Sequence, residues 1–306
     1  MHIGIDIGGT KCAVIAGEDP LHIEKKTRFA TTTVDETLAA IFKAVEEMGP
    51  ADAIGISCGG PLNEKTGVIM SPPNLPGWDN LPLCDMLTER FGIPAYLRND
   101  ANACALAEWR YGAGQGVDNM VFLTCGTGMG AGLILDGKLY SGTNGNAGEV
   151  GHIRLAPDGP VGFGKAGSFE GFCSGTGMAK LGRSLIRERQ ARGEKTPYDT
   201  FDIEKLTVKE LAEFARDGEE IARETFRISG EKMGAALSVL IDILNIDRIV
   251  IGSVFARCED LLREPMERVI AAEALGLSTA VCQVVPVALG EQIGDMAAMA
   301  VALEGR

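Results

Sequence analysis

The sequence has little of what a protein-built metal site requires. It contains only three histidines, and none of its eight cysteines forms a CxxC pair. Zinc sites in proteins are usually assembled from several cysteine and histidine ligands at short spacing. We therefore expect no zinc site, and we interpret the cysteines as small core residues of a protein from a reducing compartment.

Long apolar runs and an excess of positive charge are also missing. No stretch approaches the roughly 20 apolar residues of a membrane-spanning helix, and the first residues lack the basic and apolar regions of an export signal. The net charge of −13 makes the surface repel nucleic acid and anionic lipid. We therefore expect a soluble cytoplasmic protein whose partners include neither nucleic acid nor a membrane.

Aromatic residues are scarce, at 6% of the chain, whereas glycine is abundant, at 40 residues. This balance favours an α/β protein with many tight backbone turns. The length of 306 residues corresponds to about two lobes if a domain has roughly 150 residues. A glycine-rich run, YGAGQGVDN, is a candidate hinge near residues 112–118.

Apolar periodicity predicts alternating strands and helices. Strands at 2–8 and 11–18 form an expected hairpin around a glycine turn, and the same pattern recurs at 121–135. Residues 142–178 are rich in glycine, proline and serine, which is typical of a long functional loop. The other expected helices lie at 36–48, 81–92, 101–112, 176–192, 207–216, 219–243, 258–272 and 291–303, and the other strands at 53–58, 94–100, 248–253 and 281–287.

The first glycine turn follows Asp6. Gly8 and Gly9 let the backbone turn tightly and present N–H groups to an anion. Thr10 adds a hydroxyl and Lys11 a positive charge, while Asp6 is placed to hold a water of a hydrated Mg²⁺. An ordinary hairpin turn would carry the same glycines. A Walker-type phosphate loop is excluded, because no GKS or GKT precedes a helix here.

A second glycine turn joins two later strands and reads Thr124-Cys125-Gly126-Thr127-Gly128-Met129-Gly130. No helix follows it, which disfavours the dinucleotide-binding fingerprint of a Rossmann fold. We interpret the two turns as a pair of phosphate-binding loops, one in each lobe, that face each other across a cleft.

A strand ends and a helix begins within the run Arg98-Asn99-Asp100-Ala101-Asn102. Asp100 is a natural N-cap, which is a purely structural explanation. A carboxylate at the carboxyl end of a strand is also well placed as a general base for transfer to an alcohol. The polar side chain of Asn99, beside Asp100, can bind other hydroxyl groups of the same substrate when that alcohol is a polyol.

Glu149 and His152 lie three residues apart in the glycine-rich loop, and Glu170 follows further along it. Such side chains can bind neighbouring hydroxyls of a sugar. Taken alone, such residues in a loop are more often ordinary surface residues than ligand-binding ones.

Taken together and in this order, these motifs resemble the ROK family of bacterial sugar kinases and regulators. LTCGTGMGAGLILDGKLYSGTNGNAGEVGH resembles the family signature, DIGGTKCAVIAG its first phosphate loop and RNDANACALAE its catalytic segment. GISCGGPLNEKTGVIMSPPNLPGW resembles its sugar-side loop. The match covers nearly the whole chain, so the ordered set carries the resemblance rather than any one motif.

The resemblance implies an α/β fold of the actin-like ATPase or ribonuclease H-like type, with two lobes, a central cleft, and ATP and Mg²⁺ as cofactors. Together with the hinge, it places a small N-terminal lobe at 1–116, to which a C-terminal helix at 291–306 returns. A large C-terminal lobe would occupy 117–290. A homodimer is a family-based expectation.

The resemblance also implies roles for individual residues. Asp100 is the expected catalytic base, and a small-molecule sugar is the expected substrate. The other expected sugar-binding residues are Gly60, Asp79, Asn99, Glu149, His152 and Glu170. The residues expected to bind the nucleotide and its phosphates are Asp6, Gly8, Gly9, Thr10, Lys11, Thr127, Gly128, Gly252 and Ser253.

The sequence departs from the family in two places. Family members usually carry a structural zinc held by one histidine and three cysteines, but here Val161, Phe163 and Ser168 stand at the cysteine positions. We therefore expect no structural zinc around His152 and no metal held by the protein alone, with apolar packing by Phe163 in its place. The family's glycine run near the adenosine reads Ile251-Gly252-Ser253-Val254 here, so side chains at 253 and 254 approach the base or ribose.

The expected function is the ATP-dependent phosphorylation of a hexose hydroxyl. Glucose and its 6-position are the first choice, because NLPGW and the Glu149/His152 pair resemble glucokinase-type members. N-acetylmannosamine, N-acetylglucosamine, mannose, fructose and allose remain alternatives, as does a catalytically weak sugar-binding sensor. A repressor of the same family would carry an N-terminal helix-turn-helix, which we do not expect because the first phosphate loop begins at residue 6.

Overall fold

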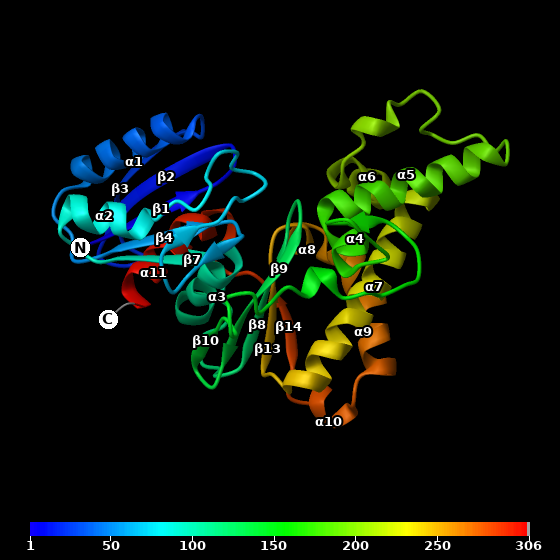
Figure 1. Cartoon of the computed structure of the whole chain (residues 1–306). Helices are drawn as coiled ribbons and strands as arrows, with labels where there is room; N and C mark the ends of the chain where they lie inside the picture. Colours follow the sequence, from blue (N-terminus) through cyan, green and yellow to red (C-terminus); the bar gives the residue numbers. More distant parts are fainter. Residues whose placement is uncertain (305–306) are drawn as a thin grey trace. The chain divides into compact units, whose positions relative to one another are not determined.

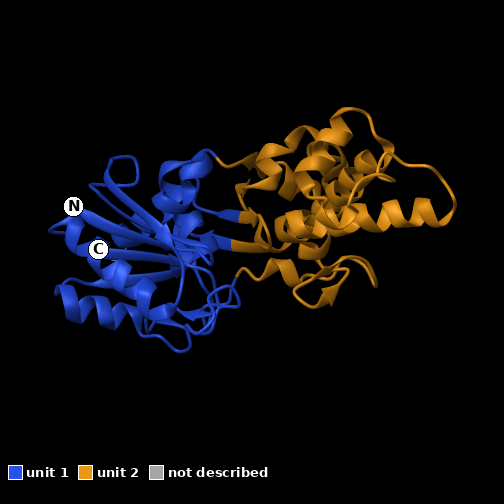
Figure 2. Ribbon diagram, turned by 90° about the horizontal axis from the view of Figure 1, so that it is seen from above, with its two compact units in different colours: residues 1–122, 132–147, 288–306 blue, residues 123–131, 148–287 orange. Residues whose placement is uncertain are grey.

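The protein divides into two compact units, each described here by itself from a computed structural model of residues 1–304. The first unit comprises residues 1–122, 132–147 and the chain from 288 onward, and the second comprises 123–131 and 148–287 (Figure 2). The sequence-based division had assigned all of 117–147 to the second lobe. Most of this segment, 117–122 and 132–147, packs in the first unit instead. Gly132 marks the contact, since a Cβ on it would lie only 2.5 Å from the carbonyl oxygen of Ala101.

The first unit is built on a five-stranded sheet with the strand order β3-β2-β1-β4-β7. β2 pairs antiparallel with both β1 and β3, whereas β1, β4 and β7 run parallel. The bounds are β1 (His2–Ile7), β2 (Lys11–Gly17), β3 (Ile23–Ala30), β4 (Ile54–Cys58) and β7 (Ala95–Asn99), and a short hairpin adds β5 (Leu62–Asn63) and β6 (Val68–Ile69). Every residue of β4 is buried, as expected of a central parallel strand covered on both faces.

The helices of the first unit are α1 (Val34–Met48), α2 (Leu83–Phe91), α3 (Asp100–Tyr111) and α11 (Ile293–Glu304), the last preceded by the 3₁₀ helix η3 (Gly290–Gln292). The chain end returns to the first sheet, because α11 packs on β1 and β4 (Figure 1). The approach is close enough to require glycine. A Cβ on Gly4 would lie 2.9 Å from the amide nitrogen of Met299, and one on Gly55 would lie 2.2 Å from that of Ala302.

The second sheet has the strand order β10-β9-β8-β13-β14, in which β13 and β14 run parallel. Residues 123–131, from the end of β8 to the start of β9, belong to the second unit. The bounds are β8 (Met120–Cys125), β9 (Met129–Leu135), β10 (Lys138–Tyr140), β13 (Arg248–Ile251) and β14 (Gln283–Pro286), with a hairpin of β11 (Val161–Gly162) and β12 (Lys165–Ala166).

The helices of the second unit gather around α7, which packs against α4, α5, α6 and α9 (Figure 1). Gly234 permits the closest contact with α9, because a Cβ there would lie 2.4 Å from the carbonyl oxygen of Met266. No helix within residues 1–304 is long and apolar enough to cross a membrane. The bounds are η1 (Val150–His152), α4 (Phe169–Cys173), α5 (Gly175–Ala191), η2 (Ile203–Lys205), α6 (Val208–Arg216), α7 (Glu220–Leu244), α8 (Val254–Arg257), α9 (Glu259–Glu273) and α10 (Gly276–Thr279).

The structure contains elements that the sequence prediction lacked, among them the short β5–β6 hairpin, α8 and α10. Strand β3 was not predicted, because its side chains are largely exposed at the edge of the sheet and mostly polar. The segment 142–178 is not a long irregular loop, since it contains η1, the β11–β12 hairpin, α4 and the start of α5. Serine caps start both helices: Ser168 accepts a hydrogen bond from the N–H of Gly171 and Ser174 from that of Gly177.

Candidate active site

The parallel strands of the first unit end side by side. β1 pairs with β4 and β4 with β7, so their carboxyl ends share one edge of the sheet. Asp6 lies near the end of β1, Gly60 follows β4, and Asn99 and Asp100 stand at the end of β7. Ligands of α/β proteins usually bind at this edge. The structure thus gathers these predicted site residues of the first unit at one place.

Asp100 is the first residue of α3. The expectation that it is the N-cap is wrong, because Asn99 occupies that position and its Oδ1 accepts a hydrogen bond from the N–H of Ala101 at 3.0 Å. Oδ1 of Asp100 accepts from the same N–H at 2.8 Å. Its other oxygen faces the bare backbone of Gly59, on which a Cβ would lie 4.0 Å from Oδ2. Oδ2 therefore remains available to a ligand.

The Asp100 side chain is open to solvent, yet it sits among many protein atoms. The partial loss of hydration raises its pKa above the ordinary value, and the hydrogen bond from Ala101 opposes this shift. A carboxylate with a raised pKa accepts a proton more readily. A raised pKa and a carboxylate oxygen without a protein partner are features that a general base requires.

Asp6 is partly buried just before the first glycine turn. Burial raises the pKa of Asp6 to about 6, and the negative charge of Asp100 adds to the rise. The nearby cations Lys11, Arg28 and Lys26 lower the pKa only in part. The two carboxylates are therefore close enough to repel each other, and a bound cation would relieve that repulsion.

A magnesium ion at this place would need ligands from outside the protein. Within residues 1–304, no group of three or more histidine, cysteine, aspartate or glutamate side chains is arranged to hold a metal. Mg²⁺ is usually bound through one or two carboxylates, waters and the phosphates of a nucleotide. Asp6 fits that pattern as a single carboxylate.

The first glycine turn leaves the backbone bare for an anion. The N–H of Gly8 donates to the carbonyl oxygen of Lys11 at 3.0 Å, and the Thr31 hydroxyl donates to the carbonyl oxygen of Gly8 at 2.6 Å. Only glycine fits at position 9, because a Cβ there would lie 2.6 Å from the carbonyl oxygen of Asn74. These features suit a phosphate group. The turn residues that reach solvent are Gly9, Thr10 and Lys11.

Gly60 and Asp79 have different surroundings. Gly60 lies against Asn99, because a Cβ on it would be 3.2 Å from the side-chain nitrogen Nδ2. Asp79 is exposed in a loop, where it accepts a hydrogen bond from the Ser71 hydroxyl. It makes no hydrogen bond to Asn99 or Asp100 in the described chain. The structure therefore joins Gly60 to the predicted sugar-binding residues of this unit and pairs Asp79 with Ser71.

In the second unit, the other glycine turn is attached to Glu170. The N–H of Gly126 donates to the carbonyl oxygen of Gly128 at 3.1 Å, and Thr127 is exposed at the tip. Oε2 of Glu170 accepts a hydrogen bond from the N–H of Met129 at 3.0 Å. A Cβ on Gly128 would lie 3.0 Å from the same oxygen. The expected phosphate loop and an expected sugar-binding carboxylate therefore form one structural group.

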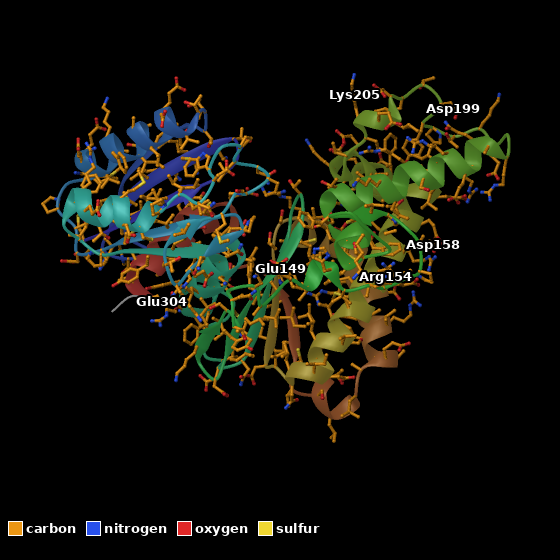
Figure 3. The ribbon with its side chains drawn as sticks, viewed as in Figure 1. Glu149, Arg154, Asp158, Asp199, Lys205 and Glu304 are labelled. Atoms are coloured by element: carbon orange, nitrogen blue, oxygen red, sulfur yellow. The ribbon has the colours of Figure 1, made fainter. Side chains whose placement is uncertain are left out.

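Glu149 and His152 border the short helix η1, where Glu149 is exposed (Figure 3). The N–H of His152 donates to the carbonyl oxygen of Glu149 at 3.2 Å. Gly151 holds this segment against α4, because a Cβ on it would lie 3.4 Å from the Cβ of Glu170. The predicted sugar-binding residues of the second unit thus lie on two segments in contact.

Phe163 packs on the ring of His152. The two ring centroids are 5.4 Å apart with the planes at 80°. Phe163 is 73% exposed and has a φ of 42°, a left-handed conformation that is unusual for a large side chain. The Lys165 ammonium donates to the carbonyl oxygen of His152 at 2.6 Å. An edge-to-face ring contact and a hydrogen bond therefore hold the His152 segment.

Gly252 and Ser253 lie beside the second glycine turn. The N–H of Gly252 donates to the carbonyl oxygen of Leu123 at 2.9 Å. Ser253 adopts φ 55° and ψ −112°, which favours glycine, and precedes α8. A Cβ on Gly126 would lie 3.6 Å from the Ser253 hydroxyl oxygen. Ser253 therefore stands at the loop that is expected to bind phosphate.

Sequence reasoning missed the polar side chains that hold these segments. Glu64 accepts hydrogen bonds from the N–H of Asn99 and the amide of Asn102. Glu108 is fully buried and accepts from the N–H of Leu289 at 2.9 Å. Glu108 had a sequence signal, as a lone charge in the apolar helical run ALAEW, whereas Glu64 stands in a polar turn that gave none.

Comparison with known proteins assigns the family. The sequence model of the ROK family matches residues 2–304. The chain belongs to the ROK family. Over 288 residues it is 33% identical to a glucokinase of Halalkalibacterium halodurans, a match that covers 90% of this chain and 86% of that protein.

Solved structures of ROK-family proteins share the fold. A ROK family glucokinase from Streptomyces griseus, solved with glucose and AMPPNP, is 30% identical, has a TM-score of 0.79 and covers 99% of both chains. A ROK family transcriptional regulator, a homologue of the E. coli MLC protein, is 25% identical with a TM-score of 0.85 and covers 99% of this chain and 78% of that one. This ROK-family protein therefore has the actin-like α/β fold that the resemblance implied.

Proposed function

We propose that this ROK-family sugar kinase transfers the γ-phosphate of ATP to the 6-hydroxyl of glucose, with Asp100 as the general base. One observation carries the proposal: Asp100, with its raised pKa and an available oxygen, stands at the same sheet edge as Asp6 and the first glycine turn. A phosphoryl transfer to an alcohol needs a proton acceptor and a phosphate-binding group near each other.

The residues of the first unit would divide the work as follows. Asp100 accepts the proton of the sugar hydroxyl, and Asn99 binds a neighbouring hydroxyl while Gly60 leaves room beside its amide. Gly9, Thr10 and Lys11 hold phosphate oxygens through backbone, hydroxyl and ammonium groups. ATP with Mg²⁺ supplies the phosphoryl group and the positive charge that stabilises its transfer.

The second unit would supply further contacts. Glu149, His152 and Glu170 bind sugar hydroxyls, and Thr127 and Gly128 bind phosphate. Because Glu170 also holds the N–H of Met129, its position depends on the turn that contains both phosphate-binding residues. The backbone of Gly252 and the hydroxyl of Ser253 lie beside the same turn and would contact the nucleotide.

The choice of sugar rests on relatives. Two related glucokinases, from Halalkalibacterium halodurans and Thermotoga maritima, are 33% and 30% identical to the chain. An N-acetylmannosamine kinase of Citrobacter koseri is 35% identical over 195 residues, which cover 62% of this chain. Glucose is therefore the first candidate, and N-acetylmannosamine is the comparison that a substrate screen must include.

The test is the rate of sugar-dependent ADP release. We expect turnover with glucose, and we expect Asp100→Asn to lower kcat by roughly 10²–10⁴-fold, because general-base catalysis typically contributes that much. Asp85→Asn is the matched control, since it removes one exposed carboxylate from α2. Near-normal turnover of Asp100→Asn would refute the base assignment. A wild-type protein that binds glucose without releasing ADP would instead be a sensor.

A further inference from the structure

Glu64 is a buried carboxylate in a turn that is otherwise exposed. It lies between β5 and β6, where Asn63 fixes the turn by accepting hydrogen bonds from the N–H groups of Lys65 and Thr66. Lys65 and Thr66 are exposed, but the Glu64 side chain is only 4% exposed. Its carboxylate therefore points away from solvent, into the protein.

The buried carboxylate contacts the residues on both sides of Asp100. Oε1 accepts a hydrogen bond from the backbone N–H of Asn99 at 3.0 Å and from Nδ2 of Asn102 at 2.7 Å. Asn99 belongs to the end of β7, and Asn102 lies in the first turn of α3. One oxygen atom thus fixes the strand end and the helix start, and Asp100 stands between them.

The hold on Asn102 depends on Glu64. Asn102 is 2% exposed, and its side-chain oxygen is buried without a hydrogen-bond partner in the described chain. Nδ2 bonded to Glu64 is therefore the polar contact that orients this side chain. Without an acceptor at position 64, both the amide of Asn102 and the N–H of Asn99 would lose their partner.

Stability alone does not account for a glutamate at this position. Oε2 is buried and makes no hydrogen bond within residues 1–304, and the nearest cation, Nη1 of Arg98, is 3.8 Å away. Arg98 instead donates to Glu304 of α11 at 2.9 Å. A buried carboxylate oxygen without a donor is unfavourable. Retaining it is consistent with a functional use of the other oxygen.

We propose that Glu64 is a positioning residue, whose Oε1 holds Asn99 and Asn102 so that the Asp100 carboxylate keeps the direction required for proton transfer. The inference deepens the proposed function and rests on Asp100 being the base. Small displacements of a reacting group lower turnover strongly, by roughly 10²-fold for about 1 Å. This role requires a hydrogen-bond acceptor at the position of Oε1, and it does not require a negative charge.

Two conservative variants separate these requirements. Glu64→Asp keeps the charge but shortens the side chain, so the carboxylate no longer reaches both donors. Glu64→Gln loses the charge, but its amide oxygen can still accept from Asn99 and Asn102. We expect kcat to fall roughly 10²-fold in Glu64→Asp and to stay within roughly threefold of wild type in Glu64→Gln.

The controls are Glu89→Asp and Glu89→Gln, at an exposed glutamate of α2. They should leave kcat unchanged. Asn102→Ala is a second variant, which removes only the contact on the helix side and places a strong helix former in α3. We expect it to lower kcat by roughly tenfold.

Amide hydrogen exchange measures the hydrogen bond from Asn99 to Glu64 and does not depend on enzyme activity. In Glu64→Asp, the peptide containing Asn99 should exchange at least about tenfold faster than in wild type, with no change in Glu64→Gln or in the Glu89 controls. Absence of wild-type sugar kinase activity would refute the proposed function and leave this measurement intact. Equal losses of kcat in the two Glu64 variants, or normal turnover in both Glu64→Asp and Asn102→Ala, would overturn the positioning role.

Discussion

Removing the charge of Asp6 should make the protein more stable and less active. The pKa of Asp6 is about 6 in the folded chain and 3.8 in the unfolded reference, mainly because burial disfavours the charged form. The folded state therefore binds the proton more tightly than the unfolded state does. The contribution of Asp6 to the free energy of unfolding is then most favourable below pH 3.8 and declines as the pH rises to about 6.

The difference between the pKa of Asp6 in the unfolded reference, 3.8, and in the folded chain, about 6, sets the size of the effect on stability. At about 1.4 kcal/mol per pK unit, the ionised Asp6 lowers the free energy of unfolding by about 3 kcal/mol at pH 8. Asp6→Asn stays neutral at every pH, so it should be more stable than wild type by up to that amount at pH 8. At pH 4.0, where Asp6 is protonated in the folded protein, the advantage should shrink to roughly half a kcal/mol.

The assay is thermal unfolding of both proteins at the two pH values, without nucleotide and with EDTA, because a bound cation would stabilise the wild-type carboxylate. Asp85→Asn serves again as the control for loss of one surface charge. Asp6→Asn should also lose sugar-dependent ADP release, since Asp6 is proposed to act at the phosphate site. A variant no more stable than wild type at pH 8, or an advantage of the same size at both pH values, would refute the reasoning.

Two further predictions concern the packing that holds the first unit together. Glu108→Gln should lower the free energy of unfolding by about 2–3 kcal/mol. Oε1 of Glu108 accepts a hydrogen bond from the N–H of Leu289 and Oε2 accepts one from the N–H of Ala113, so the amide nitrogen of glutamine would face one of these donors. An unchanged denaturation midpoint would contradict this. Gly55→Ala should lower the melting temperature by several degrees, since a Cβ would lie 2.2 Å from the amide nitrogen of Ala302 in α11. Gly276→Ala, where a Cβ would have nothing within 4 Å, is its control and should melt like wild type.

Residues of the candidate site could be located from the sequence wherever a local pattern allowed only one structural interpretation. Asp6 before Gly8 and Gly9 required a tight turn after a strand, and the structure has β1, the turn and β2 in that place. The place of Asp100 at the end of a strand could be predicted from its position in the chain alone. A short segment of chain has few allowed backbone conformations, so local sequence patterns of this kind predict local structure well.

The contacts of Glu64 could not be predicted in the same way. It meets Asn99 and Asn102 across 35 and 38 positions in the chain, and nothing in a polar turn distinguishes a buried glutamate from an exposed one. The N-cap of α3 was assigned to the wrong residue for a similar reason. Asn99 and Asp100 both have cap-forming side chains, and where the chain leaves the sheet decides between them.

The sequence by itself determined the apolar strands, the long helices and the two glycine turns, because these depend on backbone preference and on apolar spacing over a few residues; the exposed strand β3 and the short elements within 142–178 lack such a signal. Only the tertiary structure decided that Asp6 and Asp100 repel each other and that Glu170 holds the second turn. Those relations join residues far apart in the chain. They depend on how the strands are ordered and how closely the helices approach the sheet, and no short stretch of sequence encodes either.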